Sequence, residues 1–330
     1  MPSADPPSST PVAERLDGES REGFTGLPSR IPTGKTGDRI FAQSATAAGL
    51  LILITLAGVA IFLFAEAMPA ITAGADELPD GKSLIDYVAP LAFGTVLAAT
   101  IAVVLAVPIA IAVALFISHV APRRLALSLS YLVDLLAAIP SIIYGLWGIF
   151  VLGPAAVSVM EWLDEKLGFI PLFKGPASTT GRTMLVAGVV LAVMILPIIS
   201  AVAREVFSQT PRRLQEGALA LGATRWEMIR MTVLPFGKSA IVSGTMLGLG
   251  RALGETMAVA IILSVSGDVT FNLISSGNPS TIAANIALTF PESSGLDVNT
   301  LIASGLVLFA ITLVVNMGAR FIIGRRQPGV

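Results

Sequence analysis

Six long apolar runs dominate the chain, and polar segments separate them. The runs cover approximately residues 45–68, 93–117, 129–152, 184–206, 240–265 and 301–323. A bilayer core needs about 20 consecutive apolar residues per helix, and each run reaches that length with almost no charge in its middle. Strands of a membrane barrel are instead about ten residues of alternating polarity. The pattern therefore predicts an all-α membrane protein with six transmembrane helices.

The lysines and arginines are distributed unevenly among the connections. Sixteen of the 21 lie in the amino-terminal tail, the second and fourth connections and the carboxyl end, whereas the other connections hold only four. An excess of basic residues marks the cytoplasmic side of a membrane protein. Both termini are therefore expected in the cytoplasm.

The composition excludes several classes of protein. Only 13% of the 330 residues are charged and 54% are hydrophobic, whereas about 25% of a soluble domain is charged. The absence of cysteine excludes thiolate metal sites, and a single histidine, His119, cannot build a multi-histidine metal site. A net charge of -1 gives no reason to expect nucleic acid as a partner. We expect no metal site and no catalytic cluster.

The connection between the fourth and fifth runs, about residues 208–237, is polar but regularly patterned. Pro211 suits a first helical turn, and Gly222 can take the positive φ that ends a helix. A second helix is expected over 226–233, before Pro235. The residues at helical spacing in the first helix are Leu214, Ala218 and Leu221. Because residues 217, 218 and 220 are small and let another protein approach the backbone, the helix pair is predicted to be a docking element.

This connection also carries a recognisable pattern. The pattern E-x-A, then glycine, then I-x-x-x-x-L-P is carried by Glu216, Ala218, Gly222, Ile229, Leu234 and Pro235. It resembles the cytoplasmic loop in permease subunits of type I ABC importers, where a coupling helix sits in a groove of the ATPase subunit. The resemblance implies that ATPase coupling involves Glu216, Ala218, Gly222, Ala223 and Arg225. Gly217 replaces the usual alanine, and the alternative is an interfacial amphipathic helix with no partner.

The fifth run contains two charged residues. Arg251 and Glu255 are four residues apart, which places both on one face of a continuous helix. Each costs about 2.5 to 3.5 kcal/mol at mid-membrane, so they are expected to face a partner or a wet cavity. The guanidinium offers a planar fork of donors for an oxyanion, and Glu255 can hold that fork or release it. The alternative is a self-satisfied pair that only fixes helix packing.

Two further segments indicate which kind of anion is transported. GRALGETMAV in the fifth run and AAIPSIIYGLWG in the third resemble one of the two permease subunits of bacterial phosphate importers, and the similarity extends from about Leu91 to Phe321. Sulfate and molybdate permeases share the RALGE core. The resemblance implies the type I ABC importer permease fold in the bacterial plasma membrane.

The expected divisions of the chain are a disordered cytosolic tail at 1–40, the first helix and external loop at 41–90, a five-helix core at 91–323 and a cytosolic end at 324–330.

The same resemblance implies partners. They are a second homologous permease subunit (PstA-like), an ATPase dimer (PstB-like) and an extracytoplasmic phosphate-binding protein (PstS-like), with membrane lipid around the helices. No G-x-x-x-x-G-K-[ST] motif occurs, so ATP and Mg are expected to bind the ATPase, and this chain is expected to bind no cofactor.

Other polar residues within the runs are weaker candidates. Thr95, Ser141 and Tyr144 offer neutral donors to a passing anion, although such side chains also satisfy backbone carbonyls and neighbouring helices. An anion path should exclude Asp134, which is expected to pair with Arg123, Arg124 or another arginine of the loops.

Three rival functions stay open at this point. A sulfate- or molybdate-type permease would share the RALGE core. A gradient-driven anion transporter would use Arg251 and Glu255 without an ATPase, but the docking pattern argues against it. A membrane enzyme would use Glu255 as acid or base, but no nucleophile, base and orienting residue cluster in the sequence.

Overall fold

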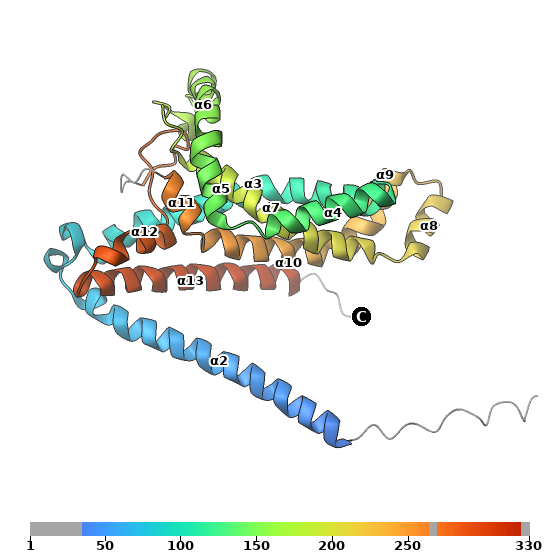
Figure 1. Ribbon diagram of the computed structural model, residues 1–330, viewed down its shortest axis with the longest axis horizontal. Helices are drawn as coiled ribbons and strands as arrows, with labels where there is room; N and C mark the ends of the chain where they lie inside the picture. Colours follow the sequence, from blue (N-terminus) through green and yellow to red (C-terminus); the bar gives the residue numbers. More distant parts are fainter. Residues whose placement is uncertain (1–34, 264–268, 325–330) are drawn as a thin grey trace, which may run out of the picture. The chain divides into compact units, whose positions relative to one another are not determined.

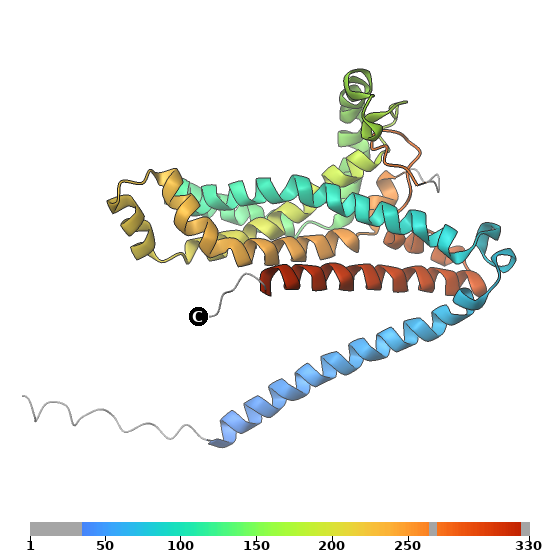
Figure 2. The same ribbon diagram turned by 180° about the vertical axis from the view of Figure 1, so that it is seen from behind.

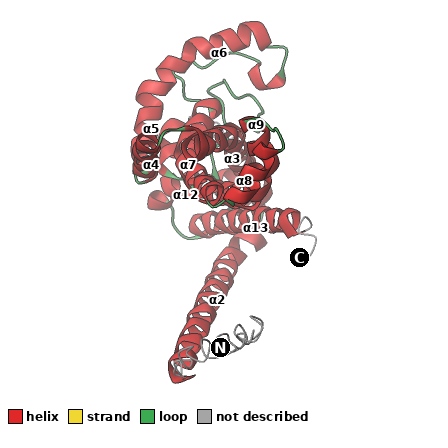
Figure 3. Cartoon of the chain, turned by 90° about the vertical axis from the view of Figure 1, so that its right-hand side faces the viewer, coloured by secondary structure: helices red, strands yellow, loops and turns green. Residues whose placement is uncertain are grey.

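The computed structural model of the protein describes residues 35–263 and 269–324 (Figure 1). Every regular element in these ranges is helical, as the sequence predicts (Figure 3). Residues 1–34 of the expected cytosolic tail and residues 325–330 of the expected cytosolic end lie outside the described part. The first helix, α2 (Lys35–Thr72), includes residues 35–40, which the sequence pattern assigned to the tail.

The chain divides into two compact units, Met1–Val59 and Ala60–Val330. The described residues of the first unit form the amino-terminal part of α2. The second unit contains the end of α2 and the helices α3 (Leu84–Leu115), α4 (Arg123–Ala137), α5 (Ser141–Trp147), α6 (Gly153–Leu167), α7 (Met184–Ser208), α8 (Arg212–Ala220), α9 (Arg225–Met228), α10 (Leu234–Leu253), α11 (Met257–Ile262), α12 (Ile282–Thr289) and α13 (Leu296–Gly324). Short π-helical turns, η3 (Phe116–Val120), η4 (Gly148–Leu152) and η6 (Ile229–Val233), follow α3, α5 and α9.

Among the described residues, five helical segments are long and apolar enough to cross a membrane. They are Gly37–Thr72, Leu84–Val120, Ser141–Leu167, Met184–Ser208 and Leu296–Phe321. Four of them coincide with the first, second, fourth and sixth apolar runs. The third and fifth runs differ from the expectation, and both differences have a local cause.

The core of the second unit is formed by α3, α7 and α10, which run side by side (Figure 2). α3 presents a row of fully buried alanines to this core, including Ala98, Ala102 and Ala106. On α7, a Cβ at Gly188 would lie 2.4 Å from Cγ2 of Ile101. Small residues let membrane helices approach closely, so the contact between α3 and α7 depends on them.

The third run is not one helix. α4 ends at Ala137 and α5 starts at Ser141, because Pro140 has no amide proton and disfavours helical backbone at Ile139. α4 packs along α7, whereas α6 points across the direction that α3, α7 and α10 share (Figures 1 and 3). The expected continuous helix over 129–152 is therefore wrong, although the proline was expected to kink it.

The fifth run is also interrupted. α10 ends at Leu253, residues 254–256 are not helical, and the six-residue α11 follows. The Glu255 carboxylate accepts a hydrogen bond from the amide of Ala258 at 3.1 Å, so it satisfies a free donor at the start of a new helix. The expected continuous helix over 240–265 is therefore wrong, and this run is absent from the five long segments.

Candidate functional site

Arg251 lies in the last turn of α10 and is exposed. Its side chain lines an open groove of about 750 Å³ between α7, α10 and α13. The other lining residues are Ile198, Ser243, Met246, Leu247, Gly250 and Asn316. The groove is thus mainly apolar, with one permanent positive charge and two neutral polar side chains on its wall. Such surroundings strengthen the attraction between a guanidinium and an anion relative to bulk water.

Glu255 lies just beyond the end of α10, but its environment differs from that of Arg251. Glu255 is 7% exposed and its carboxylate caps α11. Among the described residues, the ion pairs within 4.0 Å are Lys166 with Glu165 and Arg204 with Asp134. Arg251 and Glu255 are therefore not paired, because the break at Gly254 removes the helical register that would bring them together. The guanidinium stays available to a ligand.

The hydroxyls of Thr95 and Tyr144 both form hydrogen bonds with the backbone of this chain. The Thr95 hydroxyl donates to the carbonyl of Leu91 at 2.7 Å and accepts from the amide of Ile282 at 3.0 Å, which fixes the start of α12 against α3. The Tyr144 hydroxyl donates to the carbonyl of Leu136 at 2.8 Å. In a continuous helix the residue four positions on would supply that donor, but Pro140 has none, so Tyr144 replaces it. Ser141 is half-buried at the start of α5.

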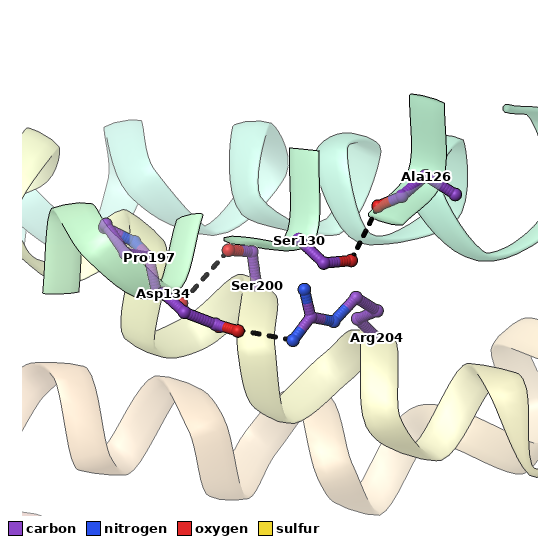
Figure 4. Close-up of polar contacts among 6 residues, drawn as sticks. All are labelled: Ala126, Ser130, Asp134, Pro197, Ser200 and Arg204. Atoms are coloured by element: carbon purple, nitrogen blue, oxygen red, sulfur yellow. Dashed lines mark hydrogen bonds and ion pairs between the residues drawn. The ribbon is translucent and has the colours of Figure 1, made fainter. Parts of the chain in front are cut away.

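Asp134 lies away from the Arg251 groove and pairs with an arginine, as expected, but that arginine lies near the carboxyl end of α7. Nη2 of Arg204 donates to Oδ1 of Asp134 at 3.2 Å, which links α4 to α7 (Figure 4). The neighbouring hydroxyls of Ser130 and Ser200 each donate to a carbonyl of their own helix. Both hydroxyl groups of this cluster therefore donate to backbone carbonyls, and one ion pair joins the two helices.

Within residues 35–263 and 269–324, the histidine and the acidic residues do not gather as a set of metal ligands would. Nδ1 of His119 lies 2.7 Å from Oγ of Ser118 in η3. No group of three or more histidine, aspartate or glutamate side chains in the described part of the chain has the spacing of metal ligands.

The fourth connection forms the expected helix pair, α8 and α9. Gly222 has a φ of 89°, as its place after α8 predicts. The amide of Gly222 bonds to the carbonyl of Leu219 at 3.0 Å, and that of Ala223 to the carbonyl of Ala218 at 3.2 Å. These two bonds define a Schellman motif, in which a glycine ends the helix at low steric cost.

A capping box starts α9, and it was not among the features expected from the sequence. The Thr224 side chain accepts from the amide of Glu227 at 3.3 Å, and the Glu227 carboxylate accepts from the amide and the hydroxyl of Thr224 at 2.8 Å each. These backbone and side-chain bonds lower the pKa of Glu227. The T-x-x-E spacing in the sequence was a sufficient signal for this start.

The predicted coupling residues divide between surface and interior. Glu216, Gly222 and Arg225 are exposed and Ala223 is half-buried. Ala218 is only 8% exposed. It belongs to a buried cluster that also contains Phe207, Met228, Ile229 and Val233. The expectation that Ala218 lets a partner approach the backbone is therefore wrong, because this alanine lets α8 pack on its own chain.

Other apolar side chains of the same connection face outward. Leu221 is 92% exposed and Trp226 is 61% exposed, and Leu214 and Leu219 are exposed as well. We call Glu216, Leu219, Leu221, Arg225 and Trp226 the coupling face. Large exposed apolar residues rimmed by charges are typical of protein interaction sites. The signal for Leu221 and Trp226 was their size in a polar segment of two short helices, which have little apolar surface to bury them.

Comparison with known proteins gives several relatives of nearly the full length. The phosphate transport system permease protein PstC 2 of Mycobacterium tuberculosis is 46% identical over 307 residues, covering 89% of this chain and 94% of the relative. The corresponding PstC protein of Mycobacterium leprae is 45% identical, covering 88% and 95% of the two chains. That of Mesorhizobium japonicum is 38% identical, covering 87% and 90%.

Solved structures with the same fold are distant in sequence. A bacterial alginate ABC transporter, in complex with a periplasmic protein that holds an alginate pentasaccharide, matches with a TM-score of 0.61 and 18% identity, over 92% of this chain and 100% of the other. A second structure, of a bacterial ABC transporter that imports alginate, matches with a TM-score of 0.58 and 16% identity, over 88% and 97%.

The family comparison places the chain in a defined class. The family described as "Binding-protein-dependent transport system inner membrane component" matches residues 106–328, which include the Arg251 groove and the coupling face. The chain is thus a multi-pass protein of the bacterial inner membrane with the type I ABC importer permease fold. It is a transport subunit rather than an enzyme, and it acts with other ABC components. The chain belongs to the family of binding-protein-dependent transport system inner membrane components.

Proposed function

We propose that this chain is a permease subunit of an ATP-driven phosphate importer, and that it forms half of the translocation path. The observation that carries the proposal is the 46% identity with a PstC 2 protein over 89% of the chain. The exposed Arg251 in an apolar groove supplies matching chemistry, because a guanidinium suits a tetrahedral oxyanion.

The Arg251 groove is the proposed phosphate contact. Two donors of the guanidinium face the anion, and the neutral side chains of Ser243 and Asn316 add further polar contacts on the same wall. The groove is open, and a second homologous permease completes the path. An open site binds the anion weakly, which allows it to leave toward the cytoplasm.

The other path candidates take supporting roles in this proposal. Thr95 and Tyr144 position α12 and the junction of α4 and α5 through the hydrogen bonds they make to the backbone. Glu255 positions α11, and its negative charge at the junction raises the cost of holding an anion there. Ser141 contributes a hydroxyl at the start of α5.

The coupling face is the proposed contact with the ATPase. Leu221 and Trp226 fill apolar hollows of the partner, while Glu216 and Arg225 supply charges at the rim. ATP and Mg bind an ATPase dimer, and an extracytoplasmic binding protein delivers phosphate at the opposite end. ATP-driven closure of the dimer moves α8 and α9, which follow α7 and precede α10 in the chain.

Phosphate uptake by vesicles tests the assignment of Arg251. The vesicles contain this chain, the second permease and the ATPase, with the binding protein outside. Arg251→Ala should lower uptake by about 10-fold to 100-fold, since a charge-assisted hydrogen bond contributes roughly 1.5–3 kcal/mol. Arg320→Ala, which removes an exposed arginine near the end of α13, is the matched control and should leave uptake unchanged.

One result would reject the assignment of Arg251, and another would reject phosphate as the substrate. Unchanged uptake in Arg251→Ala would remove the groove from the path. Inhibition of phosphate uptake by equimolar sulfate or molybdate would instead favour a permease of the sulfate or molybdate type.

A further inference from the structure

α11 is a six-residue helix that other parts of the chain must hold in place. It begins after the break at residues 254–256 and its last residue is Ile262. An isolated helix of this length is unstable, because nucleation costs more than a few hydrogen bonds return. It nevertheless lies in the core, with Ala258, Val259 and Ile262 all at most 1% exposed.

The two ends of α11 are held by opposite charges. Oε1 of Glu255 accepts from the amide of Ala258 at the start of the helix. At the other end, Nη2 of Arg182 donates to the carbonyls of Ile261 at 3.4 Å and Leu263 at 3.3 Å. A carboxylate at the amino end and a guanidinium at the carboxyl end both match the helix dipole. The two charges thus act across a helix about 9 Å long.

Arg182 lies in a closely packed and hydrogen-bonded part of the fold. Gly181 has a φ of 73°, and a Cβ there would lie 2.3 Å from the carbonyl oxygen of Gly153, so the chain packs directly on the start of α6. The amide of Ser178 bonds to the carbonyl of Ile274 at 2.8 Å, and that of Leu185 to the carbonyl of Leu273 at 2.9 Å. Arg182 is therefore fixed at the end of α7 that lies opposite the coupling face.

Not every N–H donor of the Arg182 guanidinium has a hydrogen-bond partner. Its Nε is buried and has no hydrogen-bond partner. None of the acidic side chains in the described ranges lies within 4.0 Å of its guanidinium. The carbonyls of α11 are therefore the acceptors that hold this cation in the protein.

The sides of α11 are confined by α5 and η4. A Cβ at Gly145 would lie 2.8 Å from Cα of Ala258, and a Cβ at Gly148 would lie 2.7 Å from Cδ1 of Ile262. Lateral packing thus sets the distance of α11 from α5, and the contacts at its two ends set its position along its own axis.

We propose that Arg182 is a positioning residue for transport. It pins α11 and thereby fixes the junction at residues 254–256, which joins α11 to the end of α10 that carries Arg251. The inference rests on the proposed function, in which Arg251 meets the anion. Loss of the Arg182 contacts lets α11 shift, and the junction at residues 254–256 then no longer presents Arg251 to the groove in one geometry.

A cysteine reporter on α11 tests this proposal independently of transport. The chain has no cysteine, so Met257→Cys, at a position 43% exposed, gives a single reactive site. Arg182→Gln should increase its labelling rate by a water-soluble maleimide several-fold in membrane vesicles and lower phosphate uptake. Arg182→Lys keeps the charge and one donor group and should restore part of both. Lys174→Gln, which removes an exposed charge of the same segment, should change neither.

The outcomes separate the two proposals. Unchanged labelling in Arg182→Gln, or an equal effect of Lys174→Gln, would overturn the role of Arg182. Co-purification of the ATPase subunit should be the same in all variants, and its loss in both Arg182 variants would show a general folding role instead. If the unsubstituted chain takes up no phosphate, the proposed function fails, while the labelling ratio still decides whether Arg182 pins α11.

Discussion

At the scale of single residues, the turn between α8 and α9 depends on the backbone conformation of Gly222. Gly222 has a φ of 89°, and a Cβ added there would meet no atom within 4 Å. Steric room is therefore not the constraint, and the left-handed backbone is. Gly217, on the exposed side of α8, also has open space where a Cβ would lie but has ordinary helical backbone, so it separates these two effects.

Alanine at the two positions should have opposite effects. Gly222→Ala should destabilise the turn by about 1–2 kcal/mol, because a side chain disfavours left-handed backbone. Gly217→Ala should instead stabilise α8 by about 0.5–1 kcal/mol. The measurement is the affinity of the purified permease for its ATPase subunit, which should fall in Gly222→Ala only. Equal affinities in both variants would show that the turn does not set the coupling face.

The capping box of α9 predicts a dependence on pH. The bonds from Thr224 lower the pKa of Glu227 in the folded loop, so the unfolded loop binds the proton more readily. The contribution of the box to stability is therefore present above the unfolded pKa and is lost as pH falls below about 4. Limited proteolysis of the loop should accelerate over that range. In Glu227→Gln the acceleration should be smaller, and an identical pH profile would contradict the assignment.

At the scale of elements, hydropathy predicted the long helices but not their breaks. Four apolar runs became continuous helices, whereas the third and fifth divided at Pro140 and Gly254. Averaged over 20 residues, a run with a break is as apolar as one without, so this signal cannot locate it. The replacement of a missing backbone donor by Tyr144 and the capping by Glu255 are tertiary and local compensations that stabilise each break. They also give Tyr144 and Glu255 a structural role within apolar runs.

Packing between α5 and α11 gives an element-scale prediction. Gly145→Ala would place a Cβ 2.8 Å from Cα of Ala258, and backbone cannot yield as a side chain can. The substitution should therefore displace α11, cost about 1–3 kcal/mol and reduce phosphate uptake. Gly318→Ala on α13 adds the same methyl where no atom lies within 4 Å and is the control. Thermal stability and uptake should fall only in Gly145→Ala, and equal values would show that α11 tolerates displacement.

At the scale of the whole molecule, the chain is a transport subunit of the binding-protein-dependent permease family. The sequence holds no phosphate-binding loop motif, and the pattern of its fourth connection by itself correctly indicated the ABC permease family. The pattern could not indicate that Ala218 faces inward or that Thr95 is saturated with backbone bonds, because both depend on how α8 packs on α7 and α9 and how α3 meets α12. Family and fold thus follow from sequence patterns, and the accessible residues of the site follow from packing.

ATP dependence of phosphate uptake tests the proposed function most directly. Vesicles containing both permeases and the ATPase, with the binding protein outside, are loaded with ATP or with a non-hydrolysable analogue under the same ion gradients. We expect phosphate accumulation with ATP and none with the analogue. Equal accumulation in both, driven by an ion gradient, would contradict it and show that this chain belongs to a transporter that needs no ATPase.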